Sequence, residues 1–185
     1  KRAVVYLQSI AVGDESGTLI PYLDNPKTGP TWDKYYLSTC HGPVGTTLVF
    51  RMLYELTGEQ EYLDWIKRLA RGIIRAGAPE KNSWGYWASN CQCCGAPGVL
   101  EHFVSVYELT GEEEFLEYAK RTADVLVGDS QLLDGKRRWM SAWNRPTPEV
   151  VKSFTGFYVG SAGGSSSLLK LYSALENKPF TDIFE

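Results

Sequence analysis

The chain has 185 residues, enough for one domain with a sizeable core, and 43% of them are hydrophobic and 22% charged, as in ordinary globular proteins. A net charge of −3 provides no basic field of the kind that binds nucleic acid or anionic lipid. The sequence shows neither a signal-peptide pattern nor the run of about 18 apolar residues that a membrane helix needs. We therefore expect a cytoplasmic protein that binds neither nucleic acid nor membrane.

The first part of the chain predicts one helix followed by irregular structure. Residues 1–12 carry apolar side chains at helical spacing and are typical of the end of a helix. The glycines and polar residues at 13–17 break this helix. Residues 18–37 are rich in proline, glycine and aromatic residues, which predicts a loop that has room for a short strand or turn.

An internal repeat begins after this loop. When His41 is aligned with Cys94, an offset of 53 residues, the segment 54–59 is identical to the segment 107–112. A weaker third copy begins at Val159. Periods of this size indicate stacked supersecondary units. We expect a single domain or fragment over residues 1–185, with repeats at about 40–90, 91–155 and 156–185.

Each repeat has the pattern of a helical hairpin. Residues 47–56 are apolar on nearly all sides, which predicts an inner helix that is buried on most of its surface. Gly58 is placed to end that helix in the left-handed conformation. The next helix has one apolar stripe, typical of an outer helix, formed by Tyr62, Trp65, Ile66, Leu69 and Ile73. The sequence therefore predicts an all-α fold of concentric inner and outer helices.

Long connectors lead from each outer helix to the next inner helix. Residues 76–90 and 129–155 carry aromatic residues among glycine and proline, including Trp84, Trp87, Trp139 and Trp143. Loops of this length in a compact fold are commonly functional, so Trp84 and Trp87 are candidates for substrate binding. More often, however, such tryptophans only fill the core of a loop.

All four cysteines and one of the two histidines lie in two short glycine-containing segments, residues 39–45 and 90–98. Residues 40–45 and 93–98 share the form Cys-(His/Cys)-Gly-x-x-Gly, and each opens an apolar run. Soft ligands gathered in such turns are typical of a zinc or thiol site. Disulfides and buried structural thiols remain open alternatives. Metal is favoured because three cysteines within four positions close no long loop, and a bond between adjacent cysteines is strained.

Three further residues near these turns each allow two interpretations. His41 could be a proton shuttle or a ligand, but a turn residue bonded to backbone is the more common case. His102 lies within the second predicted inner helix, where a hydrogen-bonded core or lumen histidine is expected. Cys91 is interpreted as structural or redox-labile, because three thiolates from one short loop rarely fit one tetrahedron.

The two cysteine segments, followed by residues 156–163, resemble the lanthionine synthetase C-like cyclases. The resemblance covers residues 40 to about 175. In that family seven helical hairpins form an α/α toroid, and turns of these three types occur in the last three repeats. The resemblance implies that this chain is the C-terminal part of such a barrel. A missing N-terminal part of the toroid, or a self-associated copy, would then complete the ring.

The resemblance also implies a zinc site. The family's ligands carry over to Cys40 in the first turn and to Cys93 and Cys94 in the second, with Cys94 in the place of a histidine. Thr39 stands where the family has tryptophan. The family's acid/base histidine and aspartate belong to earlier repeats, so the chain is either a C-terminal fragment or a reduced relative without the full chemistry. His41 is a separate candidate for an acid/base role.

This zinc site would support addition of a thiol to an activated alkene. Zinc with three protein ligands keeps one position open, and a thiol that enters it loses its proton. Addition to dehydroalanine or dehydrobutyrine then closes a thioether ring, once a general acid supplies a proton. The hypothesis is a zinc-dependent cyclase acting on a peptide or on a small thiol such as glutathione.

Two other functions stay open at this point. A carbohydrate-active α/α-toroid enzyme would need two carboxylates across its lumen, and the candidates are Asp33, Glu101 and Glu149. A non-catalytic relative would be a zinc-stabilised scaffold that binds a peptide or partner.

Overall fold

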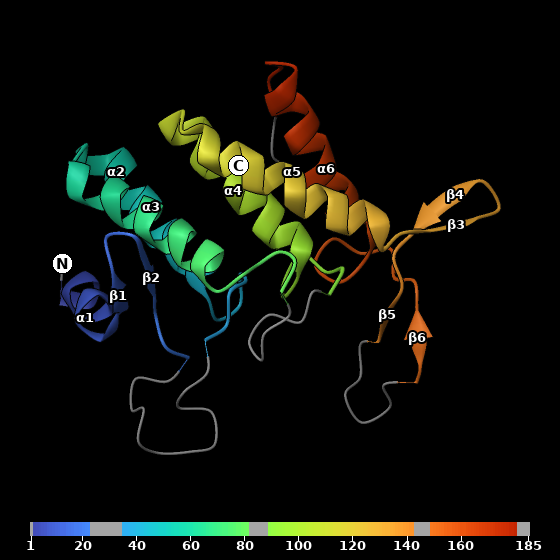
Figure 1. The fold of residues 1–185 in the computed structure, drawn as a ribbon, viewed down its shortest axis with the longest axis horizontal. Helices are drawn as coiled ribbons and strands as arrows, with labels where there is room; N and C mark the ends of the chain where they lie inside the picture. The colour runs from blue at the N-terminus through green and yellow to red at the C-terminus, as the bar shows by residue number, and fades with distance from the viewer. Residues whose placement is uncertain (1, 23–34, 82–88, 143–148, 181–185) are drawn as a thin grey trace. The chain divides into compact units, whose positions relative to one another are not determined.

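The computed structural model describes residues 2–22, 35–81, 89–142 and 149–180. Within these ranges the chain forms six helices of 9 to 16 residues and six strands of only two or three residues (Figure 1). The expected all-α fold is therefore confirmed. The chain divides into two compact units, residues 1–87 and 88–185, which are described in turn.

The first unit begins with a helix and a small hairpin. Its elements are α1 (Arg2–Ile10), β1 (Val12–Asp14), β2 (Gly17–Leu19), α2 (Pro43–Thr57) and α3 (Gln60–Arg75). The predicted N-terminal helix is confirmed, and the predicted break after it is the β1–β2 hairpin. Strand β2 lies against α3, where Gly72 is required because a Cβ atom would collide with the carbonyl oxygen of Thr18.

Helices α2 and α3 form the first predicted hairpin. Gly58 ends α2 in the left-handed conformation, with φ of 68°, and its N–H donates to the carbonyl oxygen of Tyr54 at 2.7 Å. The rings of Phe50 and Trp65 stack at 5.4 Å between the two helices. The apolar stripe predicted for α3 is buried throughout, so the assignment of its packed face is confirmed.

Helix α2 is less buried than its sequence predicts. The side chains of Leu48, Met52 and Leu56 are 54%, 61% and 79% exposed, and α3 covers the opposite side, where Phe50 is fully buried. The prediction of a helix buried on most sides is therefore wrong for α2. Apolar residues all round a helix show which faces could be buried, but they do not supply a neighbour for every face.

The second unit is built around one central helix. Its helices are α4 (Ala96–Thr110), α5 (Glu113–Gly128) and α6 (Ser161–Leu175). Helix α4 packs against both α5 and α6, and Val99, Leu100, Phe103 and Val104 are fully buried along it. The inner position predicted for the second copy of the repeat is confirmed here, in contrast to α2.

The connector after α5 contains two antiparallel hairpins where the sequence predicted a loop. They are formed by β3 (Gln131–Leu133) with β4 (Lys136–Arg138), and by β5 (Ser141–Ala142) with β6 (Val151–Lys152). The β3–β4 hairpin extends beyond the end of α5 (Figure 1). Asp134 and Gly135 form its tip with φ of 50° and 71°. An Asp-Gly pair between two short runs is a strong hairpin signal, so this element could have been predicted.

The three copies of the repeat share the same local geometry. Helices α2, α4 and α6 each have 15 residues, and each follows an extended glycine: Gly42, Gly95 or Gly160. Helices α3 and α5 each have 16 residues. The repeat found in the sequence is therefore also a repeat of local structure. The proposed repeat boundaries and the single-domain assignment stay predictions.

Candidate metal centre

The cysteine turn that opens α4 is held by its own backbone. The N–H of Gly95 donates to the carbonyl oxygen of Cys91, and that of Ala96 donates to the carbonyl oxygen of Ser89, both at 2.9 Å. A Cβ atom at position 95 would collide with the Ser89 carbonyl oxygen. Glycine is therefore required at this point by the close approach of the chain, which folds the turn onto the first residue of the helix.

Cys91 is buried within this turn and accepts a hydrogen bond there. Its Sγ atom lies 3.3 Å from the backbone nitrogen of Cys94, which donates to it, and 3.3 Å from the Oγ atom of Ser89. The N–H of Cys93 donates to the carbonyl oxygen of Tyr158 at 3.1 Å. The buried Cys91 thiol thus stabilises the turn through its backbone, while the side chains of Cys93 and Cys94 are half-buried.

The turn that opens α2 has the same form. The N–H of Gly42 donates to the carbonyl oxygen of Ser38 at 3.0 Å, and Cys40 is exposed. His41 is also exposed and lies edge-on to two aromatic rings, with ring centroids 4.9 Å from Tyr22 and 5.4 Å from Tyr36. Its exposed ring therefore packs on the buried Tyr36 and the half-buried Tyr22, and its role in proton transfer stays a prediction.

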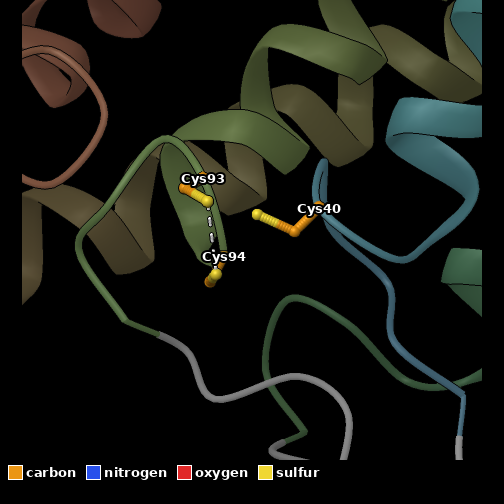
Figure 2. Close-up of side chains that lie close together, drawn as sticks. All are labelled: Cys40, Cys93 and Cys94. Carbon is orange, nitrogen blue, oxygen red and sulfur yellow. Dashed lines mark hydrogen bonds between the residues drawn. The ribbon is translucent and has the colours of Figure 1, made fainter. Parts of the chain in front are cut away.

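The structure brings the sulfur atoms of Cys40, Cys93 and Cys94 together, all within 4.8 Å of one another (Figure 2). The Sγ atoms of Cys93 and Cys94 are 3.5 Å apart. In a tetrahedral zinc site with Zn–S bonds of about 2.3 Å, two sulfur atoms are about 3.8 Å apart. The spacing of the Cys93 and Cys94 sulfur atoms is close to that value, and thiolates are ligands that zinc prefers.

The oxidation state of the cluster decides whether it can hold a metal. Cys40 and Cys93 are disulfide-bonded in the structure, whereas Cys91 and Cys94 carry free thiols. The disulfide that the sequence made the less favoured alternative is therefore present. A metal ligand must be a thiolate, so only the reduced cluster can offer three sulfur ligands. A disulfide and a metal site are two alternative states of one group of sulfur atoms.

His102 differs from the expectation of a hydrogen-bonded histidine. Its side chain is buried in α4, and its Nε2 atom has no hydrogen-bond partner among the described residues. Burial lowers the pKa of His102 from 6.5 to about 4, so the ring is neutral at pH 7. The sequence placed this histidine inside a buried helix correctly, but it could not show whether a hydrogen-bond partner faces it.

The remaining candidates are placed as follows. Trp84, Trp87 and Asp33 lie outside the described residues. Glu149 is exposed, whereas Glu101 accepts a hydrogen bond from Gln92 in a buried polar group that sequence reasoning missed. Trp139 is buried and its Nε1–H donates to the carbonyl oxygen of Leu126 at 2.7 Å, as expected of a tryptophan that fills a loop core.

Comparison with protein families identifies a match to the family described as lanthionine synthetase C-like protein, over residues 40–185. The chain belongs to the lanthionine synthetase C-like family. The matched region of this lanthionine synthetase C-like chain starts at Cys40 and contains both cysteine turns and helices α2 to α6. A comparison with curated proteins returns no match. In the described ranges, none of its helices combines the length and apolar character needed to cross a membrane.

Proposed function

We propose that this chain is a zinc-dependent cyclase domain that joins a cysteine thiol to a dehydroalanine or dehydrobutyrine residue. The observation that carries the proposal is the approach of three sulfur atoms to within 4.8 Å, in a chain of the lanthionine synthetase C-like family. In the reduced protein Cys40, Cys93 and Cys94 would hold the metal as thiolates. Zinc bound there would lower the pKa of an entering thiol and hold it ready for addition.

The chain's own residues have three tasks in this reaction. Three thiolate ligands would leave one position open on a bound zinc ion, and their negative charge would preserve the nucleophilic character of the substrate sulfur. The turn residue Cys91 fixes the backbone of Cys94 through a hydrogen bond. In the addition a sulfur–carbon bond forms at Cβ of the dehydro residue, the carbon–carbon π bond breaks, and Cα takes up a proton. His41, which is exposed beside Cys40, is the proposed donor of that proton.

The proposal includes a substrate and a compartment. The substrate is a peptide with a cysteine and a dehydro residue, or a small thiol such as glutathione that adds to such a peptide. Trp84 and Trp87 are proposed to contact the peptide. A reducing compartment such as the cytoplasm is expected, because thiolates must be available for the metal.

The test uses reduced protein and a peptide that contains one cysteine and one dehydroalanine. Ring closure leaves the peptide mass unchanged, so remaining free thiols are counted by mass after alkylation with N-ethylmaleimide. We expect zinc-loaded protein to remove the free thiol. We expect chelator-treated protein and the Cys93→Ala variant to leave it, because the metal or one of its ligands is lost. Zinc added back should restore activity only to the chelator-treated wild type.

Two results would contradict the proposal at different points. Zinc-loaded protein that adds neither a peptide cysteine nor glutathione to dehydroalanine would contradict the cyclase activity and leave a zinc scaffold. Equal activity with and without metal would remove zinc from the reaction altogether.

A further inference from the structure

A buried polar group lies directly beside the cysteine turn. Gln92 separates Cys91 from Cys93, and its side chain is only 7% exposed. Its amide Nε2–H donates to Oε2 of Glu101 on α4 in a short hydrogen bond. Its amide Oε1 lies 2.9 Å from Oγ of Ser167 on α6. One side chain of the turn is therefore bonded to two different helices.

Ser167 completes this group from the other side. Its hydroxyl is fully buried and lies 3.4 Å from Oε2 of Glu101 and 3.1 Å from the carbonyl oxygen of Gly163, in addition to Gln92. A hydroxyl has one proton, so it can donate to only one of these oxygens at a time, and Oε1 of Gln92 is the nearest. The Gln92–Glu101–Ser167 group thus joins the turn, α4 and α6.

These contacts restrict the backbone at Cys93. The preceding residue, Gln92, is anchored through its side chain, and the N–H of Cys93 itself donates to the carbonyl oxygen of Tyr158. The buried amide of Gln92 is held firmly, because hydrogen bonds broken inside the protein cost more than hydrogen bonds exchanged with water. The turn is therefore held in place through the side chain of Gln92 and through the backbone of Tyr158.

We infer that Gln92, Glu101 and Ser167 are positioning residues that preorganise Cys93 and Cys94 for the metal. The inference rests on the proposed zinc site and adds to it the residues that set its affinity. Groups that orient metal ligands without touching the metal typically change affinity by about 10-fold to 100-fold when they are mutated. The Gln92–Glu101–Ser167 group fulfils that role here because it fixes the residue that directly precedes the Cys93–Cys94 pair.

The first test compares two serines on α6. Ser167→Ala removes the hydroxyl that faces Gln92, whereas Ser165→Ala removes an exposed hydroxyl from the same helix. Zinc affinity of the reduced proteins is measured by competition with a chromophoric chelator. We expect Ser167→Ala to bind zinc about 10-fold or more weakly, and Ser165→Ala to bind as the wild type does. The charge-transfer band from thiolate to Co²⁺ should change in Ser167→Ala alone.

The second test exchanges the partners of the amide–carboxylate pair. Gln92→Glu places two carboxylates against each other, whereas Gln92→Glu combined with Glu101→Gln restores one amide and one carboxylate. We expect the single variant to lose affinity and the double variant to recover much of it. If the variants unfold more easily but bind zinc with unchanged affinity and keep the Co²⁺ spectrum, the Gln92–Glu101–Ser167 group only stabilises the fold.

The outcomes separate this inference from the proposed function. Wild type that binds zinc while Ser167→Ala and Gln92→Glu bind it equally well would overturn the positioning role and leave the zinc site intact. Wild type that binds no zinc in reduced form would overturn both. If Ser167→Ala does not fold, the exchange of Gln92 and Glu101 decides, because the double variant keeps the same atoms in the core.

Discussion

At the scale of single residues, the sequence predicted which cysteines gather far better than it predicted the residues around them. The two Cys-(His/Cys)-Gly-x-x-Gly turns were visible as motifs, and the structure brings their sulfur atoms together. Gln92 and Ser167 carry no motif, since an isolated glutamine or serine is normally a surface residue. Their importance follows from what faces them, and only a structure supplies that information.

His102 should make the stability of the protein depend on pH. The folded pKa is about 4, whereas the unfolded chain takes up the proton near pH 6.5. Between these two pH values the unfolded state binds more protons than the folded state. The free energy of unfolding therefore decreases as the pH falls from about 6.5 to about 4. Above pH 6.5 His102 has no effect on it. The full loss amounts to about 3 kcal/mol.

The measurement is urea unfolding of reduced, metal-free protein at several pH values between 4 and 7. His102→Leu removes the titrating ring and keeps an apolar side chain of similar size. We expect the variant to lack this part of the acid sensitivity. The same dependence on pH in both proteins would show that His102 is not buried in neutral form.

At the scale of elements, the sequence predicted where helices end and which of their faces pack. It did not predict how many neighbouring helices bury each helix. Gly58 ends α2 as predicted, and the apolar stripe of α3 is buried as predicted. Helices α2 and α4 have similarly apolar sequences, yet α4 is covered by two helices while Leu56 on α2 is 79% exposed. Periodicity describes one helix, whereas burial depends on the neighbours that the fold supplies.

The turn before α4 should tolerate no side chain at Gly95. A methyl group there would meet the carbonyl oxygen of Ser89, which is backbone and cannot turn away. We expect Gly95→Ala to lower the free energy of unfolding by about 3 kcal/mol and to weaken metal binding. Gly128→Ala is the matched control, because the space at the end of α5 is open and alanine favours a helix.

Urea unfolding of both variants, without metal, measures this difference. Gly128→Ala should be as stable as the wild type or more stable by up to about 1 kcal/mol. Equal effects of the two substitutions would contradict the close approach at Gly95.

At the scale of the whole molecule, the internal repeat was the most informative feature of the sequence. Its six identical residues led to helical hairpins, and the structure repeats the lengths of α2, α4 and α6 together with the glycine before each. The small β-hairpins of the connector were missed, because their strands are too short to show alternation. The oxidation state of the cysteines could not be predicted, since the same sulfur cluster serves a disulfide or a metal.

The most direct test of the central claim is the metal content of reduced protein purified without chelator, measured by mass spectrometry for wild type and for Cys93→Ala. We expect about one zinc ion per chain in the wild type, because three thiolates complete a site with one open position. We expect Cys93→Ala to lose most of it, and oxidation of the wild type with diamide to release it. Reduced wild type without zinc, or Cys93→Ala with the same zinc content, would contradict the claim.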